Sequence, residues 1–154
     1  MIKNKIAKLK KLIEANNLDG YIVPKNDAYF SEYSYPDRLK TISNFSGSAG
    51  FAIILKSKNY LFVDGRYVIQ AQIQSGKYFK ILEVPKFSTE YILKKVKKKL
   101  LLGFDPQLFT SLDLKKKFNK NYDLLPITEN LIDKIYKDNP TKKITSFYNL
   151  NNKI

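Results

Sequence analysis

The sequence predicts an α/β domain with a mixed sheet that carries helices on both faces. Short apolar stretches alternate along the chain with helical patterns of about ten residues, which is typical of this class. Two apolar stretches, 51–55 and 60–63, are separated by four polar residues and predict a hairpin, so part of the sheet is expected to be antiparallel. The 154 residues, 44% of them hydrophobic, suffice for one domain with its own core.

The first elements are indicated by apolar periodicity and by proline. Apolar residues recur at helical spacing over 2–16, and Tyr21–Val23 is interpreted as a buried strand that a proline ends. Residues 25–35 are polar and aromatic, which fits a loop. Pro36 suits the first turn of a helix that we expect to end at Ser43, because a residue without an N–H loses no hydrogen bond there.

After the hairpin, helices and strands are expected to alternate. A helix over 67–75 would be capped by Asp64 and stopped by Gly76. Thr110 and Asp113 have the spacing of a capping box. The remaining expectations are strands over 78–84, 101–104 and 122–125, and helices over 88–99, 110–118 and 129–136.

The expected organisation is one domain over residues 1–140, followed by a short tail. Residues 141–154 show no clear periodicity. We interpret them as a linker toward a middle or catalytic domain that this sequence does not include, or as a loosely docked tail.

The absence of two residue types excludes several kinds of catalytic and metal-binding site. The chain contains no cysteine and no histidine, which removes disulfides, thiolate catalysis, Ser–His dyads and imidazole metal ligands. No apolar run is long enough to cross a bilayer, and lysines interrupt the apolar residues at the N-terminus. We therefore expect a cytoplasmic protein without membrane contact.

The net charge of +14 would suit a polyanionic partner. Only Arg38 and Arg66 are arginines, however, and arginine is the residue preferred for bidentate phosphate and base contacts. The lysines are accompanied by many Asn, Ile, Tyr and Phe residues, whose codons are rich in A and T. We therefore attribute the charge to genome composition or an ordinary solvated surface, and do not expect nucleic-acid binding.

The most informative motif is Phe45-Ser-Gly-Ser-Ala-Gly50, which is followed by Asp64-Gly-Arg-Tyr67. Gly47 and Gly50 could belong to a phosphate-binding loop, but such a loop leads into a helix, whereas this one leads into a strand. We therefore favour a tight turn, or a close approach of the backbone that a larger residue would prevent.

Asp64, at the end of a strand, could bind a divalent metal only together with further carboxylates. The other acidic residues considered show no pairing in the sequence: Glu32, Asp37, Glu83 and Asp105. We favour a helix cap, or an ion pair with Arg66 or Arg38.

Four aromatic residues cluster near Arg38: Tyr29, Phe30, Tyr33 and Tyr35. Aromatic side chains beside an arginine can line a ligand pocket or form a patch that a neighbouring domain covers. They can equally pack in the core, and the sequence leaves these alternatives open.

Several motifs together resemble the N-terminal domain of Xaa-Pro aminopeptidases, the aminopeptidase P members of the creatinase/prolidase superfamily. These motifs are Ser31-Glu-Tyr33, Arg38, Phe45-Ser-Gly-Ser-Ala-Gly50, Leu61-Phe-Val-Asp-Gly-Arg-Tyr67 and Gln70-Ala71. The likeness continues in Leu18–Pro24, Gly103–Pro106 and Asn130–Pro140. Two departures keep an aromatic ring: Tyr29 stands where the family often has histidine, and Phe62 where it often has tryptophan.

The resemblance implies a creatinase/prolidase N-terminal fold with a ribonuclease-H-like motif, and a non-catalytic role. In complete enzymes of this family, a C-terminal domain carries two divalent metals, typically manganese, on Asp, Asp, His, Glu and Glu ligands. That domain cleaves the bond between an N-terminal residue and proline. Nothing in this chain matches those ligands, so the resemblance implies no cofactor, metal ligand or catalytic residue here.

The resemblance also implies partners and a surface. The partners are the catalytic domain, a second copy of the complete enzyme in a homodimer, and a peptide with proline in the second position. Arg38, Asp64, Arg66 and Tyr67 would face the other domains or the substrate entrance, with Gly47 and Gly50 in a structural loop. Two other functions stay open, a free-standing polyanion-binding module and a regulatory partner of separately encoded catalytic subunits.

Overall fold

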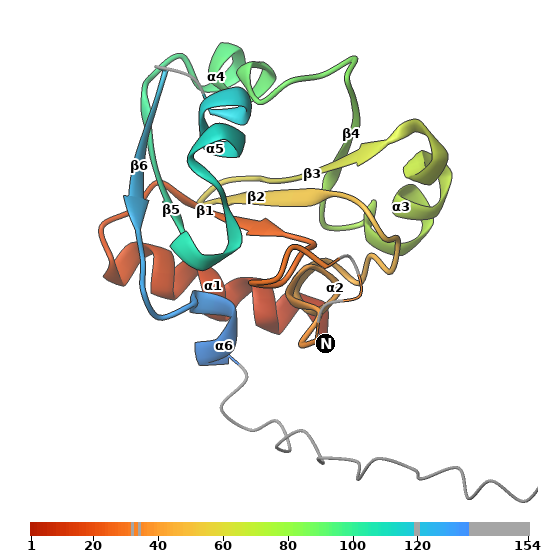
Figure 1. The fold of residues 1–154 in the computed structure, drawn as a ribbon, viewed down its shortest axis with the longest axis horizontal. Coiled ribbons are helices and arrows are strands. Elements are labelled where there is room, and N and C mark those ends of the chain that lie inside the picture. Colours follow the sequence, from red (N-terminus) through yellow and green to blue (C-terminus); the bar gives the residue numbers. More distant parts are fainter. Residues whose placement is uncertain (32, 34, 119–120, 136–154) are drawn as a thin grey trace, which may run out of the picture.

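A six-stranded mixed sheet forms the centre of this computed structural model, which describes residues 1–31, 33, 35–118 and 121–135 (Figure 1). The strands are β1 (Gly20–Pro24), β2 (Phe51–Leu55), β3 (Asn59–Asp64), β4 (Lys80–Val84), β5 (Leu100–Phe104) and β6 (Tyr122–Pro126). Their order is β4-β3-β2-β1-β5-β6, and β2 runs antiparallel to both of its neighbours. The mixed sheet and the hairpin predicted from the sequence are confirmed.

The remaining strands all run in the same direction, because β1 is parallel to β5, β5 to β6, and β3 to β4. Since β1 and β3 are each antiparallel to β2, they are parallel to one another. The carboxyl ends of these strands therefore lie at one edge of the sheet, together with the beginning of β2. We call this the carboxyl edge.

Helices cover both faces of the sheet, as the sequence predicts (Figure 1). The lower layer contains α1 (Ile2–Ala15), α2 (Arg38–Ser43) and α6 (Leu131–Ile135), and α3 (Val68–Ser75) adds Ala71 to the same core. The upper layer contains α4 (Glu90–Val96) and α5 (Ser111–Lys117).

Successive side chains of β1 pack alternately into two cores, one on each face of the sheet. Tyr21 and Val23 are buried under the lower helices, while Ile22 between them is buried on the upper face. Burial of an aliphatic side chain such as Leu9 or Ile13, both fully inaccessible in α1, contributes about 1.5–3 kcal/mol. Two apolar cores on one sheet explain why the strands are apolar on both faces.

The start of α2 differs from the prediction. The helix begins at Arg38 with Asp37 as its N-cap, so Pro36 lies outside the helix and the prediction for it is wrong. A carboxylate oxygen of Asp37 accepts the N–H of Lys40 at 3.0 Å, and its carbonyl accepts the Thr41 hydroxyl at 2.7 Å. A side-chain acceptor thus determines where the first turn begins.

Other boundaries move for reasons of local hydrogen bonding. The N–H groups of Tyr78 and Phe79 both donate to the Ser75 carbonyl, so they close α3 and β4 begins two residues later than predicted. Helix α4 ends at Val96 rather than residue 99, because Lys97 adopts a left-handed conformation with φ of 57°.

Two short 3₁₀ turns, Gly65–Tyr67 and Pro106–Leu108, were not anticipated. The capping box is confirmed, since the Thr110 hydroxyl oxygen accepts the N–H of Asp113 at 3.1 Å at the start of α5.

The predicted linker over 141–154 lies outside the described residues, as does the last residue of the helix predicted over 129–136. Within the described part of the chain, no helix is both long and apolar enough to cross a membrane.

Candidate functional site

Loops from three strands meet at the carboxyl edge of the sheet. The loop after β1 and the loop before β2 are joined where the N–H of Lys25 donates to the Gly50 carbonyl at 3.1 Å. The turn after β3 begins at Asp64 in the same edge. Open α/β sheets bind their ligands outside the carboxyl ends of the strands, so this edge is the natural place for a functional surface.

In the glycine-containing loop before β2, the backbone lies so close to neighbouring groups that a side chain would not fit. A Cβ atom at Gly47 would lie 2.2 Å from Cζ of the buried Phe45 ring. Gly50 has φ of 152°, and a Cβ atom there would lie 2.8 Å from the Phe62 carbonyl oxygen. The run leads into β2 rather than into a helix, so it does not form a helix-dipole phosphate site.

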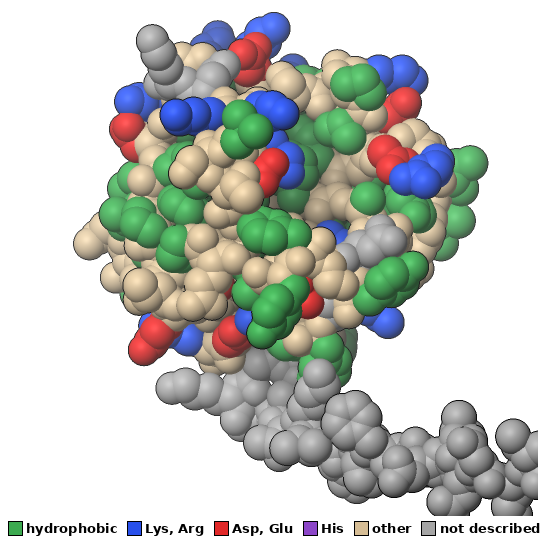
Figure 2. Space-filling view, viewed as in Figure 1, with side chains coloured by type: hydrophobic (Ala, Val, Ile, Leu, Met, Phe, Trp, Pro, Cys, Tyr) green, Lys and Arg blue, Asp and Glu red, His purple; other side chains and the backbone are tan. Residues whose placement is uncertain are grey.

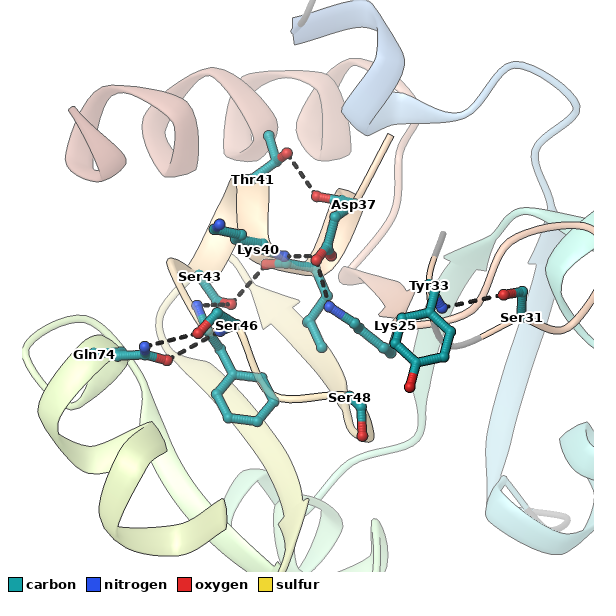
Figure 3. Close-up of polar contacts among 12 residues, drawn as sticks. Lys25, Ser31, Tyr33, Asp37, Lys40, Thr41, Ser43, Ser46, Ser48 and Gln74 are labelled. Carbon is teal, nitrogen blue, oxygen red and sulfur yellow. Dashed lines mark hydrogen bonds and ion pairs between the residues drawn. The ribbon is translucent and has the colours of Figure 1, made fainter. Parts of the chain in front are cut away.

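Side chains of α3 hold this loop in place (Figure 3). The N–H of Ser46 donates to Oε1 of Gln74 at 3.0 Å, while Nε2 of Gln74 donates back to the Ser46 hydroxyl at 2.9 Å. Gln70 donates to the same hydroxyl at 3.0 Å. The loop is therefore fixed by side chains of its own domain.

Asp64 and Arg66 form an ion pair at the end of β3. One carboxylate oxygen of Asp64 accepts the Arg66 N–H at 2.9 Å, and the other accepts Nη2 of its guanidinium at 2.7 Å. The hydrogen bonds from Arg66 lower the pKa of the Asp64 carboxyl. The Arg66 side chain is 75% exposed, so this cation is presented outward.

Tyr67 joins the two sequence motifs. Its hydroxyl shares a hydrogen bond with the Ser48 hydroxyl at 2.7 Å, and its ring meets Phe45 edge-on with centroids 5.9 Å apart. The Arg66 guanidinium lies 5.3 Å from the Tyr67 ring centroid. Asp64, Arg66 and Tyr67 are thus brought together with the glycine loop.

Arg38, at the start of α2, pairs with a residue of α6. Its Nε and Nη2 atoms both donate to Asp133 of α6, each at 2.8 Å, which raises the pKa of the guanidinium. The Arg38 side chain is only 17% exposed, and the pair ties α2 to α6. Arg38 thus contacts α6, whereas Asp64, Arg66 and Tyr67 contact one another or the glycine loop.

An ion pair that the sequence did not predict joins Lys25 to Asp37 (Figure 3). Lys25 is buried, and its ammonium contacts the carboxylate that caps α2. The sequence carried a signal for the capping role of Asp37, because aspartate is a preferred N-cap residue and Asp37 directly precedes the helical segment. Nothing in the sequence marked Lys25, which follows a strand as many surface lysines do.

The aromatic residues after β1 are exposed. The relative accessibilities of Tyr29, Phe30, Tyr33 and Tyr35 are 91%, 52%, 84% and 63%. The alternative that they pack in the core is wrong, because the loop that carries them turns back on Asp27, whose carboxylate accepts two backbone N–H groups. We call these four residues the aromatic loop.

The described residues offer no metal centre. No group of three or more Asp or Glu side chains with metal-binding geometry occurs among them. Asp64 is engaged with Arg66, and Asp105 accepts a hydrogen bond from Asn130 at 2.9 Å. The acidic residues at this edge serve caps and ion pairs.

Comparison with known proteins identifies the family. A model of the Creatinase/Prolidase N-terminal domain matches residues 5–135, most of the described chain. The chain belongs to the creatinase/prolidase N-terminal domain family. Among curated relatives, this member of the family is similar to the probable Xaa-Pro aminopeptidase P of Laccaria bicolor (34% identity over 95% of the chain) and of Arthroderma otae (36% over 92%). It spans 24% of the length of each.

Solved structures agree with the fold of this family. The X-prolyl aminopeptidase of Caenorhabditis elegans, described as a cytosolic enzyme with a di-nuclear active site, superposes with a TM-score of 0.79 at 29% identity. That match covers 91% of this chain and 26% of the nematode chain. The N-terminal domain of the cytoplasmic peptidase PepQ from Mycobacterium tuberculosis (TM-score 0.66, 22% identity, 86% of this chain and 98% of that one) shares the fold.

Proposed function

We propose that this chain is the non-catalytic N-terminal domain of a metal-dependent Xaa-Pro aminopeptidase, a cytoplasmic hydrolase that removes an N-terminal residue preceding proline. The observation that carries the proposal is the family match over residues 5–135, supported by relatives of that name at 34% and 36% identity. Because the chain spans 24% of those relatives, the catalytic machinery would lie in a further part of the enzyme.

In this proposal the carboxyl edge shapes the substrate entrance and contacts the other domains or a second subunit. Asp64 holds the turn after β3, so that Arg66 projects from a fixed backbone. Tyr67 and Ser48 brace that turn against the glycine loop. Arg38 has a separate role, since its bidentate pair with Asp133 holds α6, the last described helix, against α2.

The proposed metals, two divalent ions that we expect to be manganese, belong to the catalytic domain. The nematode relative is described as having a di-nuclear active site. The residues described for this chain do not fit such a centre, because their carboxylates do not cluster and the sequence has no histidine. This domain would contribute binding and orientation of a peptide with proline in the second position, in a homodimer of the complete enzyme.

Activity of the isolated chain tests the division of labour. The purified 154-residue protein, incubated with Mn²⁺ and an Ala-Pro-Ala peptide, is expected to release no alanine above the rate in buffer, while a complete Xaa-Pro aminopeptidase serves as the positive control. Manganese-dependent cleavage by the chain alone would overturn the proposal. The reading frame downstream of Ile154 gives a second test, because a continuation that encodes spaced Asp, Asp, His, Glu and Glu residues is expected.

A second candidate function is binding of a polyanion, and the distribution of lysines favours it. Helix α4 and the turn after it carry Lys94, Lys95 and Lys97–Lys99, and α5 carries Lys115–Lys117. Figure 2 shows several Lys and Arg side chains, with a few acidic ones between them, in the upper part of the molecule. Steeply salt-dependent binding of DNA or RNA at near-physiological salt would support this function, and absence of binding there would exclude it.

A further inference from the structure

A hollow opens on the upper face of the sheet, between the ends of β3 and β4 and the end of α5. Its volume is about 300 Å³, at the lower end of the range for small-molecule sites. Figure 2 shows this side of the molecule hollowed below lysine side chains, with hydrophobic side chains at the walls. Phe51 and Phe62 in the hollow belong to the upper core, whereas Phe45 belongs to the lower one, so the hollow adjoins the carboxyl edge from the face opposite to Phe45.

The walls of the hollow are mostly apolar. Phe51 and Phe62 stack with centroids 4.6 Å apart and planes within 4°, and Val84 and Pro85 continue the wall at the end of β4. Phe87 stands at the mouth and is 39% exposed, held edge-on against Tyr91 with centroids 5.2 Å apart. A large exposed aromatic beside a preformed apolar hollow is a surface that a second apolar group can cover.

The charge at the rim has one sign. Lys116 and Lys117 line the hollow, and none of the described lining residues is acidic. The Lys117 ammonium lies 5.1 Å from the centroid of the Phe51 ring, which places a cation directly over the apolar wall. Burial lowers the pKa of this lysine although part of its side chain is exposed, and Asp113, the acid that faces it from α5, opposes that shift.

Two acceptors of α5 close to Lys117 already accept other hydrogen bonds. The carbonyl of Lys117 would present its oxygen near the hollow, but the Thr89 hydroxyl donates to that oxygen. Asp113 is itself engaged, since its carboxylate accepts the Thr110 hydroxyl at 2.6 Å. An apolar hollow with two lysines and no acidic residue in its lining favours a ligand that combines an apolar body with a negative charge.

We propose that this hollow binds an apolar carboxylate, with an aromatic or large aliphatic group between Phe51, Val84 and Phe87 and the carboxylate at Lys117. Two sources supply this chemistry, a free acid and the C-terminal residue of a peptide. The proposal goes beyond the aminopeptidase assignment and does not depend on it, because it requires no catalytic domain.

The test is a titration of the ¹⁵N-labelled 154-residue protein, followed by two-dimensional NMR, with N-acetyl-phenylalanine as the probe. Shift changes are expected around Phe51, Val84 and Phe87, with a Kd on the order of 1 mM for a ligand of this size. N-acetyl-phenylalanine amide is expected to bind about fivefold more weakly, because it lacks the charge, and N-acetyl-alanine to cause no saturable change. A peptide that ends in Gly-Gly-Phe distinguishes the two sources, since tighter binding than the free acid assigns the site to peptide C-termini and weaker binding to free acids.

Two matched variants separate the rim charge from the general charge of the helix. Lys117→Met is expected to weaken binding of N-acetyl-phenylalanine about fivefold, while Lys115→Met, on the same helix but outside the hollow, leaves it unchanged. The proposal is overturned if the acid and the amide bind equally well, or if no shift changes appear up to about 10 mM. It is also overturned if the changes fall instead on the lysine-lined hollow around Leu93 and Lys98.

Discussion

Two regions at the same edge of the sheet use their polar and aromatic groups in opposite ways. The side chains of the glycine loop and the Asp64 carboxylate are directed inward, since Ser46, Ser48 and Asp64 all bind partners within the domain. The aromatic loop is directed outward, with Tyr29 and Tyr33 more than 80% exposed. The glycine loop, the most informative motif in the sequence, thus serves as a scaffold. The aromatic loop beside it leaves large apolar side chains exposed, where another surface can cover them.

The largest effect is expected where the two regions are anchored, at Asp37. Asp37→Ala removes the N-cap of α2 and the ion-pair partner of the buried Lys25, and is expected to lower the free energy of unfolding by about 3 kcal/mol. Urea denaturation followed by circular dichroism measures it. Asp37→Asn keeps a capping oxygen and should lose less. Equal stability of Asp37→Ala and the wild type would show that the anchor is not needed.

A somewhat smaller effect is expected inside the glycine loop. Gly50→Ala combines an unfavourable φ of 152° with a Cβ atom 2.8 Å from the Phe62 carbonyl, and should cost about 2 kcal/mol. The control is Gly65→Ala, where the new atom meets only the Glu83 carboxylate, at 3.2 Å. If the two variants unfold at the same urea concentration, the backbone at Gly50 does not lie this close to the Phe62 carbonyl in solution.

The Asp64–Arg66 pair predicts a pH dependence. Since Arg66 lowers the folded-state pKa of Asp64, the pair stabilises the fold at pH values above the unfolded pKa of an aspartate, and this stabilisation is lost as the pH falls through the lowered value. NMR titration of the Asp64 side chain should give a pKa below that of an ordinary aspartate. Arg66→Ala should raise it toward the ordinary value, and an unchanged pKa in that variant would contradict the pairing.

The smallest effect on stability is expected in the aromatic loop. The double variant Tyr29→Ser, Tyr33→Ser removes two exposed rings and should change the free energy of unfolding by less than about 0.5 kcal/mol. A loss of more than about 2 kcal/mol would mean that these rings pack against the domain, and the contrast between the two regions would disappear.

The fold class could be predicted from the sequence because the signals for strands and helices are local. Alternating apolar runs located the strands, the short gap between 51–55 and 60–63 gave the antiparallel pair, and Thr110 with Asp113 located a helix start. Contacts between residues far apart in the sequence could not be predicted in this way. Arg38 and Asp133 are separated by 95 positions and meet only because α2 and α6 cover the same face.

The exposure of the aromatic loop and the presence of the upper hollow could not be predicted from the sequence for a related reason. Exposure of Tyr29 or Tyr33 depends on how the chain turns after β1, and composition alone fits either core or surface. The hollow combines residues from Phe51 to Lys117, which come together only when β2, β4 and α5 are assembled. Periodicity reports which residues are apolar, and not which apolar residues stay uncovered.

The most direct test of the proposed entrance surface is Arg66→Ala in the complete enzyme. The Arg66 side chain is 75% exposed and pairs with Asp64 at the surface, so the variant should fold normally while kcat/KM for an Xaa-Pro peptide, or the assembly of subunits, decreases. Lys99→Ala, which breaks a surface pair with Asp123 at the opposite edge of the sheet, is the matched control and should change neither. If Arg66→Ala leaves both kcat/KM and assembly at the wild-type level, this edge does not face the substrate or the other domains.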